Sequence, residues 1–224
     1  MGELYMEADN NRQKVFYDGI DWKKLRFYQK ADTLYQMTFV FCKRFLPPYG
    51  DRTVDQMVQA ARSGKQNIVE GSEDGKTSTE MELRLLNVAR SSLQELRQDY
   101  EDYLNTRRLV TWGSAHPRYD ALLSFCRLHN AYADYAPIVE KCTDEEFCNI
   151  ALSVCHITDK MMCSYLDYLQ KRFIEQGGLK ERMYAARTGY RQKIDSQMKA
   201  LKSENAALKE EIKRLKELLK EKKG

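Results

Sequence analysis

Apolar side chains recur at steps of three and four residues through most of the chain. This period places them on one face of an α-helix. It predicts four long helices, near residues 22–46, 52–71, 78–107 and 144–176. Between the third and the fourth, residues 116–129 predict a short helix with Pro117 in its first turn, and residues 132–142 an irregular connection. We therefore expect an all-α fold, an antiparallel four-helix bundle with an inserted short helix.

Residues that commonly begin or end helices set the expected boundaries. Gly71 is predicted to cap the C-terminus of the second helix. Thr77 with Glu80, and Thr143 with Glu146, have the spacing of a capping box, which predicts the starts of the third and fourth helices.

The last part of the chain predicts a coiled coil. With Ile194 at position d of a heptad, the following a and d positions form a regular stripe, and most residues between them are polar or charged. Its other members are Met198, Leu201, Asn205, Leu208, Ile212, Leu215 and Leu219. Asn205 at an a position favours two parallel strands, and Glu204 with Lys209, like Glu211 with Lys216, has the g-to-e spacing of such a pair.

Glycines divide the chain before this stripe. Gly177 and Gly178 are expected to end the fourth helix, a short basic helix to follow at 179–187, and Gly189 to break it. The predicted domains are a flexible segment 1–21, a bundle 22–190 and a parallel coiled coil 191–224.

Charge is unevenly distributed along the chain. The formal net charge is +4, and residues 191–224 hold 11 basic and 6 acidic groups, so the remainder is nearly neutral. A nearly neutral bundle does not by itself indicate a nucleic-acid-binding protein, although a local basic face is compatible with one.

Six cysteines occur without a CxxC pair. Cys148, Cys155 and Cys163 recur along one side of a helix, so buried thiols are expected rather than a metal or redox site. No apolar run has the length of a membrane span, and the start of the sequence is polar and acidic. We therefore expect a cytoplasmic protein with no metal and no cofactor.

The segment RSGKQNIVEG, residues 62–71, has small and polar residues where a helix normally has apolar ones. Gly64, Asn67, Glu70 and Gly71 allow three interpretations: a phosphate-binding turn, a catalytic pair of Asn67 and Glu70, or a close helix contact. No strand precedes the segment, and no second carboxylate or suitably spaced histidine completes a catalytic site. We expect a close contact at Gly64, with Asn67 and Glu70 bonded across to another helix, and no catalytic residues.

Basic and aromatic residues are interleaved at the start of the first helix, around Trp22. Such residues can contact phosphates and stack on bases, or form a core stripe with a solvated rim. The candidate nucleic-acid-binding residues, all expected to have solvated charges, are Lys23, Lys24, Arg26, Lys30, Arg107 and Arg108.

One pattern within residues 60–104 consists of Ser63, Asn67-Ile-Val-Glu70-Gly71, Ala89, Ser92, Leu93, Glu95 and Leu96. This pattern resembles a bacterial four-helix-bundle family that includes proteins encoded by intervening sequences of large-subunit ribosomal RNA genes. The same family contains the accessory variability proteins of diversity-generating retroelements, and residues 108–190 are similar to its "four helix bundle suffix" variant.

This resemblance implies a basic homopentamer that binds a reverse transcriptase and RNA or DNA. Asn205 departs from that expectation because it favours a dimer. We therefore expect a non-enzymatic, oligomeric nucleic-acid-binding or reverse transcriptase accessory scaffold. The alternative is a protein–protein assembly adaptor with no nucleic-acid contact.

Overall fold

The computed structural model describes residues 20–47 and 52–221, and every regular element within these ranges is a helix. The predicted all-α class is thus confirmed. The elements are η1 (Trp22–Lys24), α1 (Arg26–Phe45), α2 (Arg52–Asp74), α3 (Thr79–Arg107), α4 (Tyr119–Leu128), α5 (Tyr132–Val139), α6 (Asp144–Gln176) and α7 (Leu179–Glu221). Residues 1–19, most of the predicted N-terminal segment, lie outside this description.

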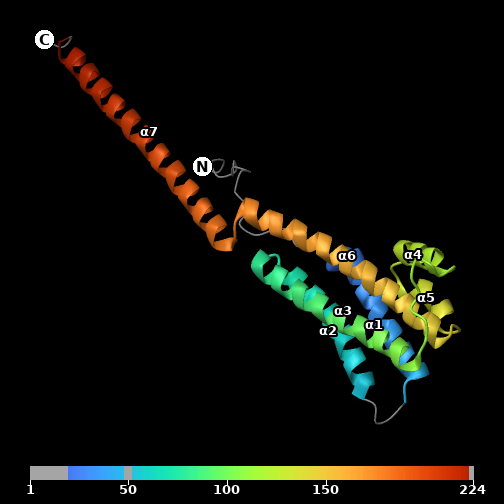
Figure 1. Ribbon diagram of the computed structural model, residues 1–224. Helices are drawn as coiled ribbons and strands as arrows, with labels where there is room; N and C mark the ends of the chain where they lie inside the picture. Colours follow the sequence, from blue (N-terminus) through green and yellow to red (C-terminus); the bar gives the residue numbers. More distant parts are fainter. Residues whose placement is uncertain (1–19, 48–51, 222–224) are drawn as a thin grey trace. The chain divides into compact units, whose positions relative to one another are not determined.

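The chain divides after Gly178 into two compact units, which are described separately. In the first, the core unit (described residues 20–47 and 52–178), α1 packs against α2 and α6, and α3 packs against the same two helices (Figure 1). Phe41 lies at its centre, with ring centroids 4.9 Å from Tyr100, 4.8 Å from Tyr103 and 5.3 Å from Phe147. Aromatic side chains from three helices therefore close one continuous core.

The first helix begins later than its apolar pattern predicts. Residues 22–24 form a 3₁₀ turn capped by Asp21, whose carboxylate accepts a hydrogen bond from the Lys23 backbone N–H. Leu25 is extended, so the α-helix starts at Arg26.

The turn between α2 and α3 also differs from expectation. Gly71 does not cap α2, which continues to Asp74. The N-cap of α3 is Ser78 rather than Thr77: Ser78 Oγ accepts from the Met81 backbone N–H, while the Thr77 hydroxyl donates to the Asp74 carbonyl. The predicted pair of Thr77 and Glu80 was therefore wrong by one residue.

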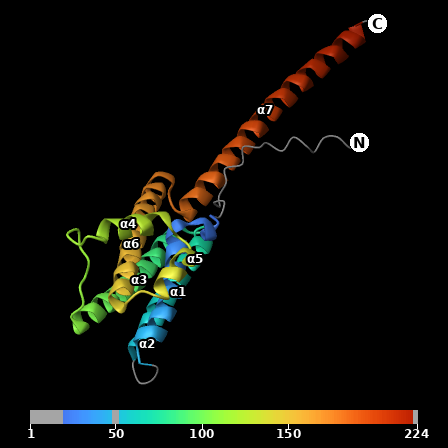
Figure 2. The same ribbon diagram turned by 90° about the vertical axis from the view of Figure 1, so that its right-hand side faces the viewer.

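Two short helices, rather than one, precede α6: α4 packs against α6 and α5 against α1, on the side of the core unit that faces the viewer in Figure 2. Pro117 lies before α4 rather than in its first turn, and α5 forms where an irregular connection was expected, with Pro137 inside it. Burial of Tyr135 and Val139 stabilises α5 despite the hydrogen bond that proline cannot donate. Arg44 of α1 fixes the end of this segment by donating to the Val139 and Cys142 carbonyls.

The boundaries of α6 agree with prediction. The Thr143 hydroxyl accepts from the Glu146 N–H, and the Glu146 carboxylate accepts from the Thr143 N–H, which completes the capping box. Gly177, with a φ of 70° and a ψ of 172°, ends the helix in a positive-φ conformation that glycine adopts without a steric penalty.

The second unit contains one long helix, α7. The predicted break at Gly189 is absent, and the short basic helix and the heptad stripe are parts of the same helix. A single glycine inside a helix costs only about 1 kcal/mol, which the good helix formers on both sides offset. The expected boundary at residue 190 thus lies inside α7.

Candidate functional site

Gly64 of α2 lies against Leu93 of α3. A Cβ atom at Gly64 would be 2.6 Å from Leu93 Cδ2, far inside van der Waals contact. Beside it, Ser63 Oγ and Ser92 Oγ are 3.0 Å apart and share a hydrogen bond. Of the three interpretations of RSGKQNIVEG, this geometry supports the close helix contact.

Lys65 of this segment pairs with Asp32 of α1 at 3.2 Å, but the hydrogen bonds of Asn67 and Glu70 stay within α2. Asn67 Nδ2 donates to the Ser63 carbonyl at 2.9 Å, and Glu70 accepts from Gln66 Nε2 at 3.3 Å, both within α2. Glu70 is exposed. The expectation of bonds across the helix interface was wrong for both residues, since one-turn partners within α2 are already within reach.

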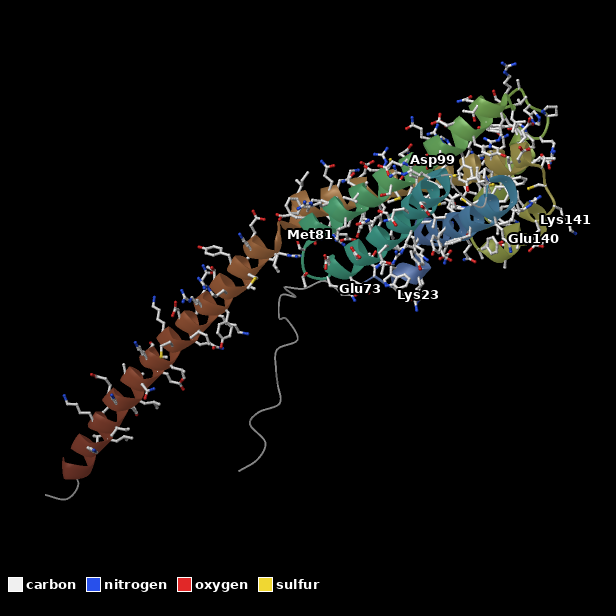
Figure 3. The ribbon with its side chains drawn as sticks, turned by 90° about the horizontal axis from the view of Figure 1, so that it is seen from below. Lys23, Glu73, Met81, Asp99, Glu140 and Lys141 are labelled. Atoms are coloured by element: carbon white, nitrogen blue, oxygen red, sulfur yellow. The ribbon has the colours of Figure 1, made fainter. Side chains whose placement is uncertain are left out.

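Three of the candidate basic residues lie at one end of the core unit. Lys23, Lys24 and Arg26 are exposed, and Lys23 Nζ lies 5.3 Å from the centre of the Trp22 ring. Trp22 Nε1 donates to Glu73 at 3.2 Å and so attaches η1 to the end of α2; Figure 3 shows Lys23 beside Glu73. The acidic neighbours Glu73 and Asp21 reduce the positive charge here, and Asp21 lies 3.6 Å from Lys24.

Lys30 is buried, which contradicts the expectation of a solvated charge. Its side chain is 0% exposed, and its ammonium donates to the Cys126 and His129 carbonyls, at 2.5 and 2.9 Å. Burial lowers the pKa of Lys30. Lys30 therefore holds the α4–α5 connection against α1. Its charge is not available to a phosphate, so Lys30 is no longer a candidate nucleic-acid-binding residue.

Arg107 and Arg108 lie at the opposite end of α3 from the turn beside η1. Both are exposed, and the Arg107 guanidinium carbon lies 3.7 Å from the centre of the Tyr103 ring. Arg108 caps the helix with a φ of 56°. A helix of this length extends roughly 40 Å, so these arginines and Lys23 do not form one surface within a single chain.

Sequence reasoning missed a buried ion pair between α3 and α6. Glu82 is 3% exposed and accepts from Arg172 Nη2 at 3.1 Å and from the Tyr165 hydroxyl at 2.9 Å. Burial raises the pKa of Glu82, and the two donors oppose that shift. The only sequence signal was a carboxylate in the first turn of α3, which is usually a solvated position.

The cysteines have the environment of core side chains. Five of the six are buried and Cys163 is half-buried. Burial raises the pKa of Cys126 to about 11 and that of Cys155 to about 12, so neither thiol is activated as a nucleophile. In the described ranges, no group of histidine, cysteine and acidic side chains has the geometry to hold a metal ion.

The apolar stripe of α7 is exposed along its described length. We call it the apolar seam: Ile194, Met198, Leu201, Leu208, Ile212 and Leu215, each 40 to 55% exposed, with Asn205 at the one polar position. Asn205 Nδ2 donates to the Leu201 carbonyl of its own helix. The side chain of Leu219, the last predicted member, lies outside the described residues.

Charges of opposite sign flank the two sides of this seam. Of the four e positions beside the seam, 202, 209 and 216 are lysines and 195 is an aspartate, whereas Glu204 and Glu211 occupy g positions. The three lysines and the two glutamates are all exposed. A second helix in the same orientation would place the g glutamates opposite the e lysines.

Comparison of the chain with protein-family models, with curated proteins and with solved structures finds no match. Among the helices described here, none combines the length and apolar character needed to cross a membrane.

Proposed function

We propose that this protein is a non-enzymatic assembly scaffold whose α7 pairs with the α7 of a second copy in a parallel coiled coil. The apolar seam carries the proposal, because six apolar side chains at alternating a and d positions are 40 to 55% exposed in the single chain. Complete burial of a leucine or isoleucine contributes about 1.5 to 3 kcal/mol relative to full exposure. Pairing buries the exposed part of each seam residue in both copies.

Charge determines the orientation of the pair. In an antiparallel coiled coil, e positions face e positions and g positions face g positions. Lys202, Lys209 and Lys216 would then meet one another, and so would Glu204 and Glu211. In a parallel pair each glutamate meets a lysine of the partner, so the parallel arrangement replaces repulsion by attraction.

For the core unit we propose an antiparallel four-helix bundle formed by α1, α2, α3 and α6, with α4 and α5 inserted before the last. The contacts of α1 and α3 with α2 and α6 support this class.

Two double variants test the scaffold. Both add two lysines, so they have the same net charge, but only one of them changes the apolar seam. Leu201→Lys with Leu208→Lys should give a one-chain mass in sedimentation, since both lysines would be buried on pairing. The control, Ser196→Lys with Ser203→Lys at outward f positions, should keep the two-chain mass. A mass of five chains, unaffected by the seam changes, would instead favour the pentamer that the family resemblance implies.

Nucleic-acid binding is a second candidate function, favoured by exposed Lys23, Lys24 and Arg26 beside Trp22 and by the basic residues of α7. Labelled single-stranded RNA and duplex DNA should bind with a log-log salt slope of about −0.7 to −0.9 per phosphate contact. Changing those three residues to glutamine should make the salt dependence of binding less steep. Changing Arg107 and Arg108 to glutamine tests whether the C-terminal end of α3 also binds. No binding at low salt would leave the protein-only adaptor.

A reverse transcriptase is the partner implied by the family resemblance. It is tested by co-expressing this chain with a reverse transcriptase of a diversity-generating retroelement. Co-purification would support the accessory role, and separate elution of the two proteins would contradict it.

A further inference from the structure

On the N-terminal side of Ile194, the face of α7 that bears the apolar seam has arginines and tyrosines instead of aliphatic residues. Continuing the heptads toward the N-terminus places Arg191 and Tyr184 at a positions and Arg187 at a d position. Tyr190 lies beside them at g, and both tyrosines are 67% exposed. Because α7 is continuous through Gly189, these side chains extend the same face as the apolar seam.

Arginines at core positions oppose pairing in this segment. In a parallel pair, Arg187 faces its own copy, and Arg191 faces its own copy about one helical turn away, roughly 6 Å along the axis. Four guanidinium groups therefore converge between the two helices. Both arginines are exposed, and within the described residues neither has an ion pair; the next carboxylate after them in the chain is Asp195.

We propose that the paired Arg187 and Arg191 side chains of two copies form a binding site for phosphate groups. A guanidinium donates two parallel hydrogen bonds to phosphate oxygens, and a phosphate dianion cancels the repulsion that otherwise separates the helices. The hydroxyls of Tyr184 and Tyr190 supply further donors at the edge of the site. The site exists only between two copies, so the proposal rests on the parallel pairing proposed above.

The ligand tightens the dimer because it binds the paired state alone. When the phosphate ligand exceeds its dissociation constant about tenfold, the dimer dissociation constant should fall about tenfold. Without the ligand, the two helices stay apart around Arg187 and Arg191, and only the apolar seam holds the pair together.

Sedimentation of the full chain measures this effect. The dimer dissociation constant is determined in chloride, in pyrophosphate and in a thymidine oligonucleotide, all at equal ionic strength. A response to pyrophosphate identifies free phosphate groups as sufficient, whereas a response to the oligonucleotide alone identifies phosphates of a nucleic-acid backbone. Either response supports the site.

The matched variants separate this site from general charge effects. Arg187→Gln with Arg191→Gln should dimerise more tightly than the parent in chloride and lose the response to the ligand. The control, Lys199→Gln with Lys213→Gln at outward b positions, removes the same charge and should keep the response.

Two results would overturn the phosphate site while leaving the scaffold intact: a parent dimer that responds to neither ligand, or an equal response in the arginine variant. A parent that stays monomeric at every concentration contradicts both proposals.

Discussion

Leu93 Cδ2 occupies the position beside Gly64 that a side chain would need: a Cβ there would approach it to 2.6 Å. The contact joins α2 to α3, and the neighbouring Ser63–Ser92 hydrogen bond lies in the same interface. Small residues at this point therefore allow the two helices to pack closely.

Gly64→Leu should destabilise the core unit by about 1 to 3 kcal/mol, the usual cost of overpacking. Gly189→Ala is the control, because a Cβ there meets nothing within 4 Å and alanine favours the helix by about 1 kcal/mol. Denaturant unfolding of both variants measures the difference. Equal midpoints for Gly64→Leu and the parent would show that the contact tolerates a large side chain.

Arg172→Met should cost about 3 kcal/mol, because it leaves the buried Glu82 carboxylate without its cationic partner. The loss should be larger at pH 8 than at pH 5, since removing the guanidinium raises the pKa of Glu82 further and protonation relieves the buried charge. Lys171→Met, at an exposed neighbouring position, is the control. A loss independent of pH would mean that Arg172 acts through packing alone.

Asp99 should make stability depend on pH. Burial, reinforced by Asp102 and Glu95, raises the pKa of Asp99 from 3.8 to about 6. The folded state then binds the proton more tightly, so the contribution of Asp99 to stability falls as pH rises through this interval.

Asp99→Asn should therefore gain stability relative to the parent at pH 7, with a smaller gain at pH 4. Urea unfolding at both values, with exposed Asp167→Asn as the control, measures it. The same gain at both pH values would show that ionisation of Asp99 is not the cause.

The periodic features of this protein were predictable, because periodicity reports local geometry. The helical class and the Thr143 capping box follow from residues within one turn of each other. The exposed apolar seam likewise follows from the heptad spacing alone.

Contacts between distant residues were not predictable in this way. Lys30 resembles a solvated charge until carbonyls almost 100 positions later are brought to it, and Glu82 meets Arg172 only when α6 packs on α3. The separation of Lys23 from Arg107 is also a consequence of chain reversal between α2 and α3. No local pattern carries that information.

Asn205→Ile should stabilise the coiled coil of α7 and relax its preference for two strands, because it removes the polar side chain from an a position. Thermal unfolding followed together with sedimentation mass tests both effects. A variant with unchanged melting temperature and unchanged mass would show that Asn205 does not lie in a helix interface.

The central claim, that α7 assembles the protein, is tested most directly by the mass in solution of the full chain and of a chain ending at residue 190. We predict a two-chain mass for the full protein and a one-chain mass after removal of residues 191–224, with the helical core still folded. The same mass for both proteins, whether one chain or several, would contradict assembly through α7.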